Sequence, residues 1–404
     1  MSRVRRSSFA RGALTAVLLS GVVASSCNSG PSTPPTPTAE PTPTVISTEA
    51  LAEICVRAPL PAEFRPGEVP PWDPGDQFAI LVEKRLALYH EQKLDYRAGL
   101  KDYDPAGDYL DYGKILRYEE DTTFRWDERG IPLVQHDGEY HTQPTTTANY
   151  ALALYGRMLA GTATKEQFLA AADALIGLQD SRGAFPYSFR YEYYRTKEVL
   201  EPGWVSALAQ GLALSVFRRA YDLSGDERYI EAGNAALEFM AESTRNGGTR
   251  DTLARLDPSL DRFVFFKEYP TADPQYTLNG FLFDLVGLYD WSGVNDSDDA
   301  RLARDLFDCG IASTIYLLPY HEIGGISAYD LGHIIEGGAP NVPPRYHAIH
   351  IRLLNALNSV APHPELAFWR DKWMSQVDEY IPAEPTEVGQ ATPSPSPEPT
   401  GTAP

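Results

Sequence analysis

The chain has 404 residues, a formal net charge of −20 and an aromatic content of 11%. An acidic excess of this size argues against nucleic acid or an anionic lipid surface as a general partner, because both are polyanions. Once the two low-complexity ends are set aside, roughly 335 residues remain, which is enough for a large core built as one big domain or two.

The first 27 residues have the order of a secretory signal: arginines, an apolar run from Ala13 to Val23, then small residues. The run is too short to remain as a membrane-spanning helix. Ala24-Ser25-Ser26-Cys27 is similar to a bacterial lipobox, in which the cysteine is lipidated. We therefore expect residues 1–27 to be a lipoprotein signal and the mature protein to be extracytoplasmic, held at the bacterial cell surface only by a lipid on Cys27. Ordinary cleavage and an uncleaved anchor are the alternatives.

Residues 28–47 and 385–404 consist mostly of proline, threonine, serine and other small residues. Such segments bury too little apolar area to offset the entropy of ordering, so we expect both to be disordered. The first reads as a semi-rigid spacer because it is rich in proline. Between them we expect an N-terminal part at 48–147 and a helical domain at 148–384.

The helical domain is expected to consist of helix pairs. The first members of the second and third pairs are apolar nearly all round, whereas their partners carry charges on one side, which is typical of inner and outer helices. The sequence therefore predicts a mainly α fold, an incomplete (α/α) toroid of helical hairpins; an irregular helical bundle is the alternative. The expected pairs are 148–160 with 164–178, 204–223 with 226–241, 276–289 with 298–317, and 346–360 with 364–380.

Local signals refine this prediction. Thr164 stands three residues before Gln167, the spacing of a capping box at a helix start. In the N-terminal part, residues 77–94 read as a helix and residues 115–134 as a region with short β-strands.

Three long connections carry the unusual residues of the chain, at 184–203, 262–279 and 319–346. The first contains six aromatic residues up to Tyr194, and the other two interleave aromatic and polar residues. Long connections in a compact domain are usually functional or disordered, and these are too aromatic for disorder. Because aromatic rings suit the apolar faces of sugars, we expect a carbohydrate cleft.

The cysteines are Cys27, Cys55 and Cys309. With Cys27 lipidated, Cys55 and Cys309 are free to pair in an oxidising compartment. Two buried free thiols are an equal alternative, because the sequence does not give their geometry. The cysteines and histidines do not have the spacing of a zinc site, so we expect no metal.

Separated motifs in the second half of the chain agree in order and spacing with one family. They resemble the C-terminal helical domain of D-glucuronyl C5-epimerases, which convert glucuronate to iduronate within heparan-type chains. The resemblance runs from about Val199 to Leu354, and the large β-rich region of the animal enzymes has no evident counterpart here. The motifs are Leu200-Glu201-Pro202-Gly203-Trp204, Lys267-Glu268-Tyr269-Pro270 with Leu278-Asn279-Gly280, Tyr329-Asp330-Leu331, and Tyr346-His347 with His350.

The resemblance implies proton removal at C5 of a uronate and redelivery of a proton on the opposite face, without a cofactor. Tyrosine is a strong base when ionised and a competent acid when not. We expect Tyr346 and Tyr269 to be the opposing acid/base pair and Tyr329 to contact the substrate carboxylate or a hydroxyl. Glu268 either orients Tyr269 or is itself the base.

One position departs from the family pattern, which has an arginine after Tyr-Asp-Leu where this chain has Gly332. Such an arginine is a natural clamp for a carboxylate because its fork binds in a bidentate manner. Arg345 and Arg190 are the expected substitutes. The other residues expected to contact substrate are Glu201, Trp204, Asn279 and His347, although Trp204 also fits the core of an inner helix.

The expected ligand is a glucuronate-containing polysaccharide or oligosaccharide, unsulfated because the chain is acidic, and the animal enzymes suggest a homodimer. Two other readings stay open. The first is a toroidal glycan lyase or hydrolase. A lyase also removes the proton from C5, but it then expels the C4 substituent instead of returning a proton. A non-catalytic surface glycan-binding lipoprotein would keep the cleft, and Gly332 is the feature that favours it.

Overall fold

The computed structural model describes residues 55–60, 74–112 and 123–380. The expected signal with Cys27, the spacer at 28–47 and the tail at 385–404 lie outside these ranges. Within them, no helix combines the length and the apolar character that a membrane span requires.

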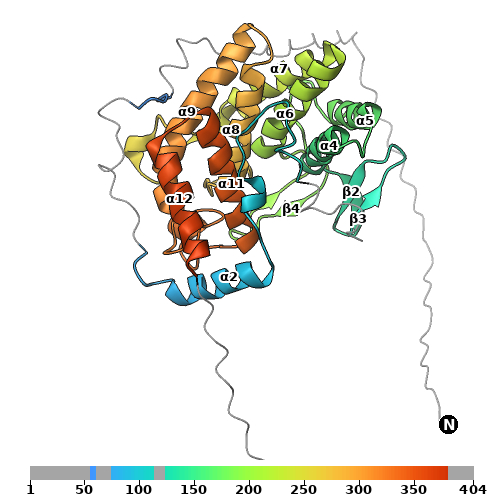
Figure 1. The fold of residues 1–404 in the computed structure, drawn as a ribbon. Helices are drawn as coiled ribbons and strands as arrows, with labels where there is room; N and C mark the ends of the chain where they lie inside the picture. The colour runs from blue at the N-terminus through green and yellow to red at the C-terminus, as the bar shows by residue number, and fades with distance from the viewer. Residues whose placement is uncertain (1–54, 61–73, 113–122, 381–404) are drawn as a thin grey trace, which may run out of the picture. The chain divides into compact units, whose positions relative to one another are not determined.

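Most of the described structure is helical, which confirms the mainly α prediction (Figure 1). The helices are α2 (Ala79–Glu91), α4 (Pro144–Leu159), α5 (Lys165–Ile176), α6 (Ala207–Ser224), α7 (Arg228–Ala241), α8 (Leu278–Ser292), α9 (Asp298–His321), α10 (Gly332–Ile335), α11 (Pro344–Val360) and α12 (Pro364–Asp378).

The long helices form two layers. Helices α4, α6, α8 and α11 pack side by side in that order, and each also packs against the next helix in the chain, namely α5, α7, α9 and α12. The inner α8 lies between α6 and α11, and all of its side chains except Tyr289 and Ser292 are buried, which accounts for its apolar character all round. The alternation of inner and outer helices is therefore present, and closure of the row into a toroid stays a prediction.

The strands are short and antiparallel. One sheet contains β1 (Arg125–Trp126), β2 (Pro132–His136) and β3 (Glu139–Thr142), in that order. Asp137 and Gly138 join β2 to β3 with positive φ angles of 50° and 87°, as a two-residue hairpin turn of type I′ requires. Two further pairs are β4 (Tyr191–Glu192) with β5 (Val199–Leu200), and β6 (Arg250–Thr252) with β7 (Val264–Phe266).

One predicted helix start is confirmed and another lies three residues further along the chain. The capping box is present, since Gln167 donates its backbone N–H to the Thr164 hydroxyl and Thr164 donates to the Gln167 side chain. The helix expected from Trp204 begins instead at Ala207. Trp204 instead ends a turn in which its N–H donates to the carbonyl of Glu201 at 3.1 Å, and its own carbonyl accepts from the N–H of Tyr187 at 2.8 Å.

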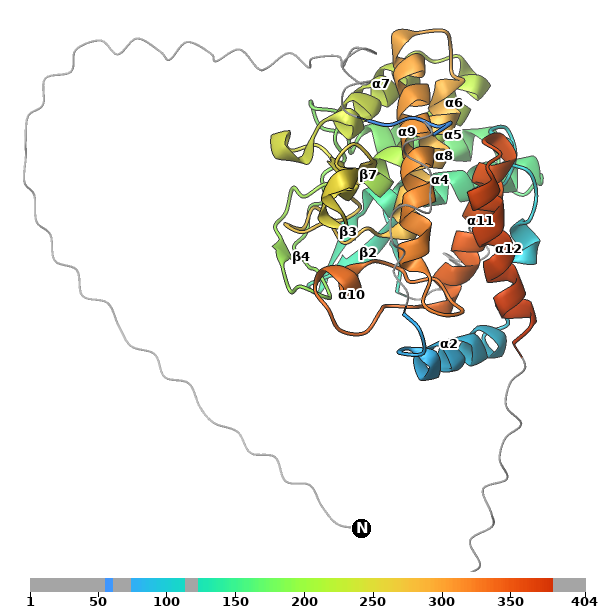
Figure 2. The same cartoon turned by 90° about the vertical axis from the view of Figure 1, so that its left-hand side faces the viewer.

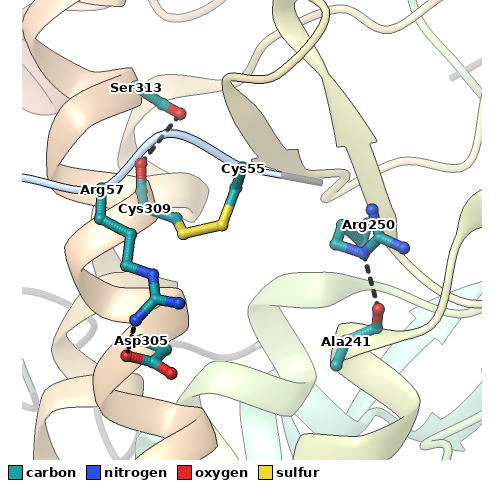
Figure 3. Close-up of a disulfide and its surroundings, with 7 residues drawn as sticks. All are labelled: Cys55, Arg57, Ala241, Arg250, Asp305, Cys309 and Ser313. Carbon is teal, nitrogen blue, oxygen red and sulfur yellow. Dashed lines mark hydrogen bonds and ion pairs between the residues drawn. A yellow bond between two sulfur atoms is a disulfide. The ribbon is translucent and has the colours of Figure 1, made fainter. Parts of the chain in front are cut away.

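The N-terminal part contacts both inner and outer helices. Cys55 is joined by a disulfide to Cys309 in α9, and Arg57 next to it pairs with Asp305 of the same helix (Figure 3). Helix α2 lies near the ends of α11 and α12 in both ribbon views, where the His90 side chain bonds the carbonyl of Val377 at 3.0 Å (Figure 2).

Candidate active site

A cavity of about 450 Å³ lies where the N-terminal turns of the four inner helices meet the long connections. Helices α4, α6, α8 and α11 all contribute residues of their first two turns, or the residue just before them, to its wall. The lining residues are Tyr112, Phe124, His136, Gln143, Thr145, Thr146, Asn149, Tyr187, Phe189, Tyr191, Trp204, Ser206, Leu208, Glu268, Tyr269, Asn279, Phe283, Arg345, Tyr346 and Ile349.

Strand β7 delivers Glu268 and Tyr269 to the cavity. Lys267, the residue between the strand and this pair, is held by its backbone on both sides. Its N–H donates to the carbonyl of Thr249 at 2.9 Å, and its carbonyl accepts from the N–H of Ala207 at the start of α6 at 2.9 Å. The loop is thereby fixed against the first turn of an inner helix.

Glu268 is the carboxylate at the centre of the site. Burial raises its pKa from 4.5 to about 7, although hydrogen bonds from the hydroxyls of Tyr269 and Tyr329 act in the opposite direction. Oxygen Oε1 lies 3.4 Å from the Tyr329 hydroxyl, and Oε2 is buried with no hydrogen-bond partner in the described part of the chain. A group that titrates near neutral pH is suited to accept and return a proton.

Tyr329 stands directly behind this carboxylate. Its backbone carbonyl accepts from the first residue of α8, Leu278, at 2.9 Å, and its N–H donates to Asn341 at 2.7 Å. Its hydroxyl lies 3.4 Å from that of Tyr269. Tyr329 does not itself line the cavity. It connects Tyr269 and Tyr346, which do, because its ring also lies 4.6 Å from the ring of Tyr346.

The three tyrosines are protonated at neutral pH. Burial raises the pKa of Tyr269 and of Tyr329 well above 10, with the charge of Glu268 as the next cause. The pKa of Tyr346 is raised to about 12, again first by burial and then by Glu268, while Arg345 lowers it. Proton transfer from a tyrosine in this cluster therefore needs an acceptor, and Glu268 is within reach of Tyr329.

Aromatic rings cover one wall of the cavity. Glu201, Pro202, Gly203 and Trp204 form a turn with proline at the second position and a φ of +100° at Gly203, which glycine adopts readily. This turn places Trp204 in a stack on Tyr187, with ring centroids 3.8 Å apart. Trp204 is thus a wall residue and not part of a helix.

The predicted substrate-binding residues separate into two groups. Trp204, Asn279 and Arg345 line the cavity, and Arg345 is exposed. Among the described lining residues, Arg345 is the one arginine or lysine. By contrast, Arg190 and Glu201 lie outside the lining, exposed and 3.8 Å from each other.

His347 also lies outside the lining and is fully buried. Its Nδ1 accepts from the backbone N–H of Ser327 at 3.0 Å, and the Ser327 hydroxyl also bonds Nδ1 of His350. Burial lowers the pKa of His347 to about 3, so the ring is neutral and part of the core. Within the described ranges, no three His, Cys, Asp or Glu side chains are grouped as a metal site requires.

The part of the wall that comes from β2 and α4, next to the aromatic rings, was not foreseen from the sequence. Gln143, Thr145, Thr146 and Asn149 come from the start of α4, and His136 from β2 stacks on Phe189 with ring centroids 3.7 Å apart. The polar run Gln143–Asn149 around a proline, just before the expected helix at 148, is the one signal that would have identified this part of the wall.

Comparisons with known proteins find relatives for the part of the chain that carries this site. Residues 179–375 match the family model described as D-glucuronyl C5-epimerase C-terminus. The chain is 34% identical over 217 residues to D-glucuronyl C5-epimerase of Caenorhabditis elegans, covering 51% of this chain and 34% of that protein. It is 31% identical over 148 residues to an uncharacterized protein of Methanocaldococcus jannaschii, covering 36% of this chain and 45% of that one. The chain therefore spans less than half the length of these relatives. Its residues 179–375, which carry Glu268 and the three tyrosines, belong to the D-glucuronyl C5-epimerase family.

Proposed function

We propose that this protein is a uronosyl C5-epimerase that interconverts D-glucuronate and L-iduronate residues in a glycan. The observation that carries the proposal is the convergence of Glu268 with Tyr269, Tyr329 and Tyr346 around one cavity that also holds an arginine. The name of the worm relative supports the choice of a glucuronate substrate.

The reaction removes a proton from C5, next to a carboxylate. This carbon acid is very weak because the carboxylate already carries a negative charge, so the site has to stabilise the enolate-like state that develops. Arg345 at the start of α11 offers a planar pair of donors to that carboxylate. The N-terminal turns of α4, α6 and α8 face the same cavity, and their partial positive charge favours an anion there.

Glu268 and Tyr346 are suited to opposite roles in proton transfer. Above its pKa of about 7, Glu268 takes the hydroxyl proton of Tyr269, directly or through Tyr329, and the resulting tyrosinate takes the proton from C5. Tyr346, which remains protonated, delivers its proton to C5 from the other face. At that point Tyr269 is protonated again, Glu268 holds one proton and Tyr346 is a tyrosinate. The cycle closes when the proton on Glu268 passes to Tyr346, by way of Tyr329 or of solvent, so no cofactor is consumed.

The charges of the wall favour an unsulfated substrate. Arg345 would neutralise the uronate carboxylate, and the other described lining residues contain neither lysine nor arginine to pair with a sulfate. The chain as a whole is acidic, with a formal charge of −20, so it would repel a heavily sulfated polymer.

The test is incubation with unsulfated glucuronate polymer, heparosan first, in deuterated water, read by NMR. Deuterium at C5 together with iduronate signals supports the epimerase. Unsaturated ends would identify a lyase, and binding without exchange would identify a glycan-binding protein.

Tyr346→Phe removes one hydroxyl from the cavity wall. We expect exchange to fall by at least ~100-fold, because the acid on one face is lost, while glycan affinity stays within a few-fold. Affinity is measured by calorimetry on the same preparation. Full exchange in this variant would contradict the assignment of Tyr346.

We also propose that the protein is an extracytoplasmic lipoprotein anchored through Cys27. The disulfide between Cys55 and Cys309 supports this location, because such bonds persist in oxidising compartments. Cell fractionation of the full chain and of Cys27→Ala tests it: the lipoprotein should be membrane-bound and its variant released. Equal distribution of both forms would refute the anchor.

A further inference from the structure

The turn between β4 and β5 contacts the two loops that carry the catalytic tyrosines without lining the cavity. The hairpin closes between Tyr193 and Glu198, where the Tyr193 N–H donates to the carbonyl of Glu198 at 2.8 Å. It belongs to the aromatic connection at 184–203, and its tip has no part in the proton transfer described above.

Arg195 at this tip reaches the loop that follows Tyr329. Its guanidinium lies 3.6 Å from the carboxylate of Asp330, and it donates to the carbonyls of Gly337 at 3.4 Å and Ala339 at 3.2 Å. The side chains of Arg195 and Asp330 are 13% and 0% exposed, so the ion pair is shielded from solvent. A shielded arginine with three acceptors on one loop restrains that loop strongly.

Asp330 accepts two more hydrogen bonds from the same hairpin and one from its own loop. The hydroxyl of Tyr193 donates to it at 3.2 Å, that of Tyr194 also donates to it, and the backbone N–H of Gly332 lies at 3.0 Å. Since Asp330 follows Tyr329 directly in the chain, these bonds determine where the Tyr329 backbone lies.

The second loop is held by the other end of the same turn. Both carboxylate oxygens of Glu198 accept from the backbone N–H of Ala272, at 3.1 and 2.9 Å. The rings of Tyr191 and Tyr193 lie 5.7 and 5.0 Å from the ring of Tyr269. One hairpin therefore restrains Tyr329 on one side and Tyr269 on the other.

Gly332 makes the contact of Arg195 possible. A Cβ atom at residue 332 would lie 2.2 Å from both Cδ and Nε of Arg195, and 2.7 Å from the side-chain oxygen of Gln275. Gly332 opens the short helix α10, so its backbone does not itself require glycine. The space taken by Arg195 explains why this position carries no side chain.

We propose that Arg195 is a positioning residue of this site, which holds the Tyr329 loop against the β4–β5 hairpin through Asp330 and requires Gly332 for its passage. The catalytic part of this proposal rests on the proposed epimerase function. The structural part, a clamp that depends on residues 195 and 332 together, does not.

The first measurement is hydrogen exchange of the folded, substrate-free protein. In Arg195→Ala, the amides of Tyr329 and Leu331 should exchange at least ~10-fold faster, since the loop loses its ion pair and two bonds. Glu192→Ala on β4, whose side chain is exposed and pairs with Lys197 at 3.4 Å, is the matched control and should leave both amides unchanged. Unchanged protection in Arg195→Ala would overturn the clamp whatever the protein catalyses.

The second measurement is a double-mutant cycle on C5 exchange. Arg195→Ala and Gly332→Ala should each lower kcat, on the order of 100-fold for a displacement near 1 Å, with KM changed less than threefold. The double variant should be no worse than either single one, because Arg195, the closest neighbour that Gly332→Ala displaces, is already gone and only the end of the Gln275 side chain has to move. Additive losses, or a loss confined to KM, would overturn the positioning role.

Rescue separates positioning from general destabilisation. Arg195→Lys keeps the charge but not the fork and should recover less than a tenth of the lost activity. Arg195→Ala combined with Gly332→Arg should recover more, since it returns an arginine beside Asp330. If the parent protein exchanges no C5 proton on any uronate polymer, the proposed function fails, and the hydrogen-exchange measurement still decides the clamp.

Discussion

Two clusters of buried charged and tyrosine side chains lie at opposite ends of α8. At its C-terminal end, Asp290 accepts from Arg219 at 2.7 Å and from the hydroxyl of Tyr103 at 2.7 Å, and Arg219 also donates to Tyr103 at 3.1 Å. At its N-terminal end the spacing is longer: the Tyr329 hydroxyl lies 3.4 Å from Oε1 of Glu268 and 3.4 Å from the hydroxyl of Tyr269.

The difference between the clusters is how completely the carboxylate is bonded. Both oxygens of Asp290 accept hydrogen bonds, whereas Oε2 of Glu268 accepts none from the described residues. Buried charges that are fully paired stabilise one arrangement of the chain. A buried carboxylate with an unused oxygen is costly unless a ligand or a proton completes it. We infer that the first cluster supports the fold and that the second serves the proposed proton transfer.

The largest effect is expected from Glu268→Gln. The amide has nearly the shape of the carboxylate but accepts no proton, so C5 exchange should fall by ~10²–10⁴-fold. The fold should remain, because no buried charge loses its partner. Exchange is followed by NMR, and far-ultraviolet circular dichroism of the same samples checks the fold. Retention of more than a tenth of the activity would place the base elsewhere.

At the other end of α8, Asp290→Ala should act on stability. It leaves Arg219 buried, at 1% exposure, without its countercharge, which costs on the order of 3–5 kcal/mol. Urea unfolding measures the change. The control is Asp298→Ala, which breaks an exposed pair with Arg301 and should shift the midpoint far less. Similar midpoints for the two variants would mean that the Asp290 cluster is not structural.

The pH dependence of stability provides a third test of the contrast. The pKa of Glu268 is raised to about 7 from 4.5, so the folded state binds the proton more tightly than the unfolded state. The stability linked to this proton is fully present below pH 4.5 and is lost as the pH rises through 7, by up to about 3 kcal/mol.

Comparing Glu268→Gln with the parent protein isolates this contribution, because both contain the same buried histidines. The variant should gain relative stability between pH 5 and pH 8, measured by urea unfolding at each pH. The histidines act in the opposite direction in both proteins. Burial lowers the pKa of His321 and His347 to about 3, so their contribution is present above pH 6.5 and is lost on acidification. A constant difference between the two proteins would show that Glu268 is ionised at all these pH values.

The sequence predicted the helices well because their apolar patterns are local. The inner and outer members of the second and third pairs were identified from the charge on one face, and the structure has them in those layers. The predicted start at Trp204 was wrong because the Trp204 carbonyl, which would accept the first bond of a longer helix, accepts instead from the N–H of Tyr187 at 2.8 Å. Pro202 and Gly203 in that motif favour a turn and were the local signal against a helix there.

The site was predicted in part, for a similar reason. Glu268, Tyr269 and Tyr346 lie in motifs, so a family pattern identified them, and the structure brings them together with Tyr329. The wall from β2 and α4 depends on packing between segments far apart in the chain. The close packing of the Arg195 side chain on Gly332 does so too. No local pattern could show that the glycine accommodates an arginine 137 positions earlier.

The smallest predicted effect distinguishes the two arginines that the sequence offered as carboxylate partners. Arg345 lines the cavity, whereas Arg190 lies near Glu201 outside it. A charge-assisted hydrogen bond contributes about 1.5–3 kcal/mol, so Arg345→Ala should raise KM on the order of 10–100-fold. The KM of Arg345→Lys should lie between those of the parent protein and of Arg345→Ala, because lysine keeps the charge but cannot form the two parallel hydrogen bonds of a guanidinium.

Arg190→Ala is the matched change, since it removes the same side chain from an exposed position whose partner, Glu201, is itself solvated. Its KM should stay within a factor of about two, as is usual for exposed pairs. Steady-state exchange rates over a range of glycan concentrations measure both variants. A larger rise in KM for Arg190→Ala than for Arg345→Ala would indicate that the substrate carboxylate binds outside the tyrosine cavity, near Arg190 and Glu201. In that case, the unused oxygen of Glu268 would need another explanation than an incoming uronate.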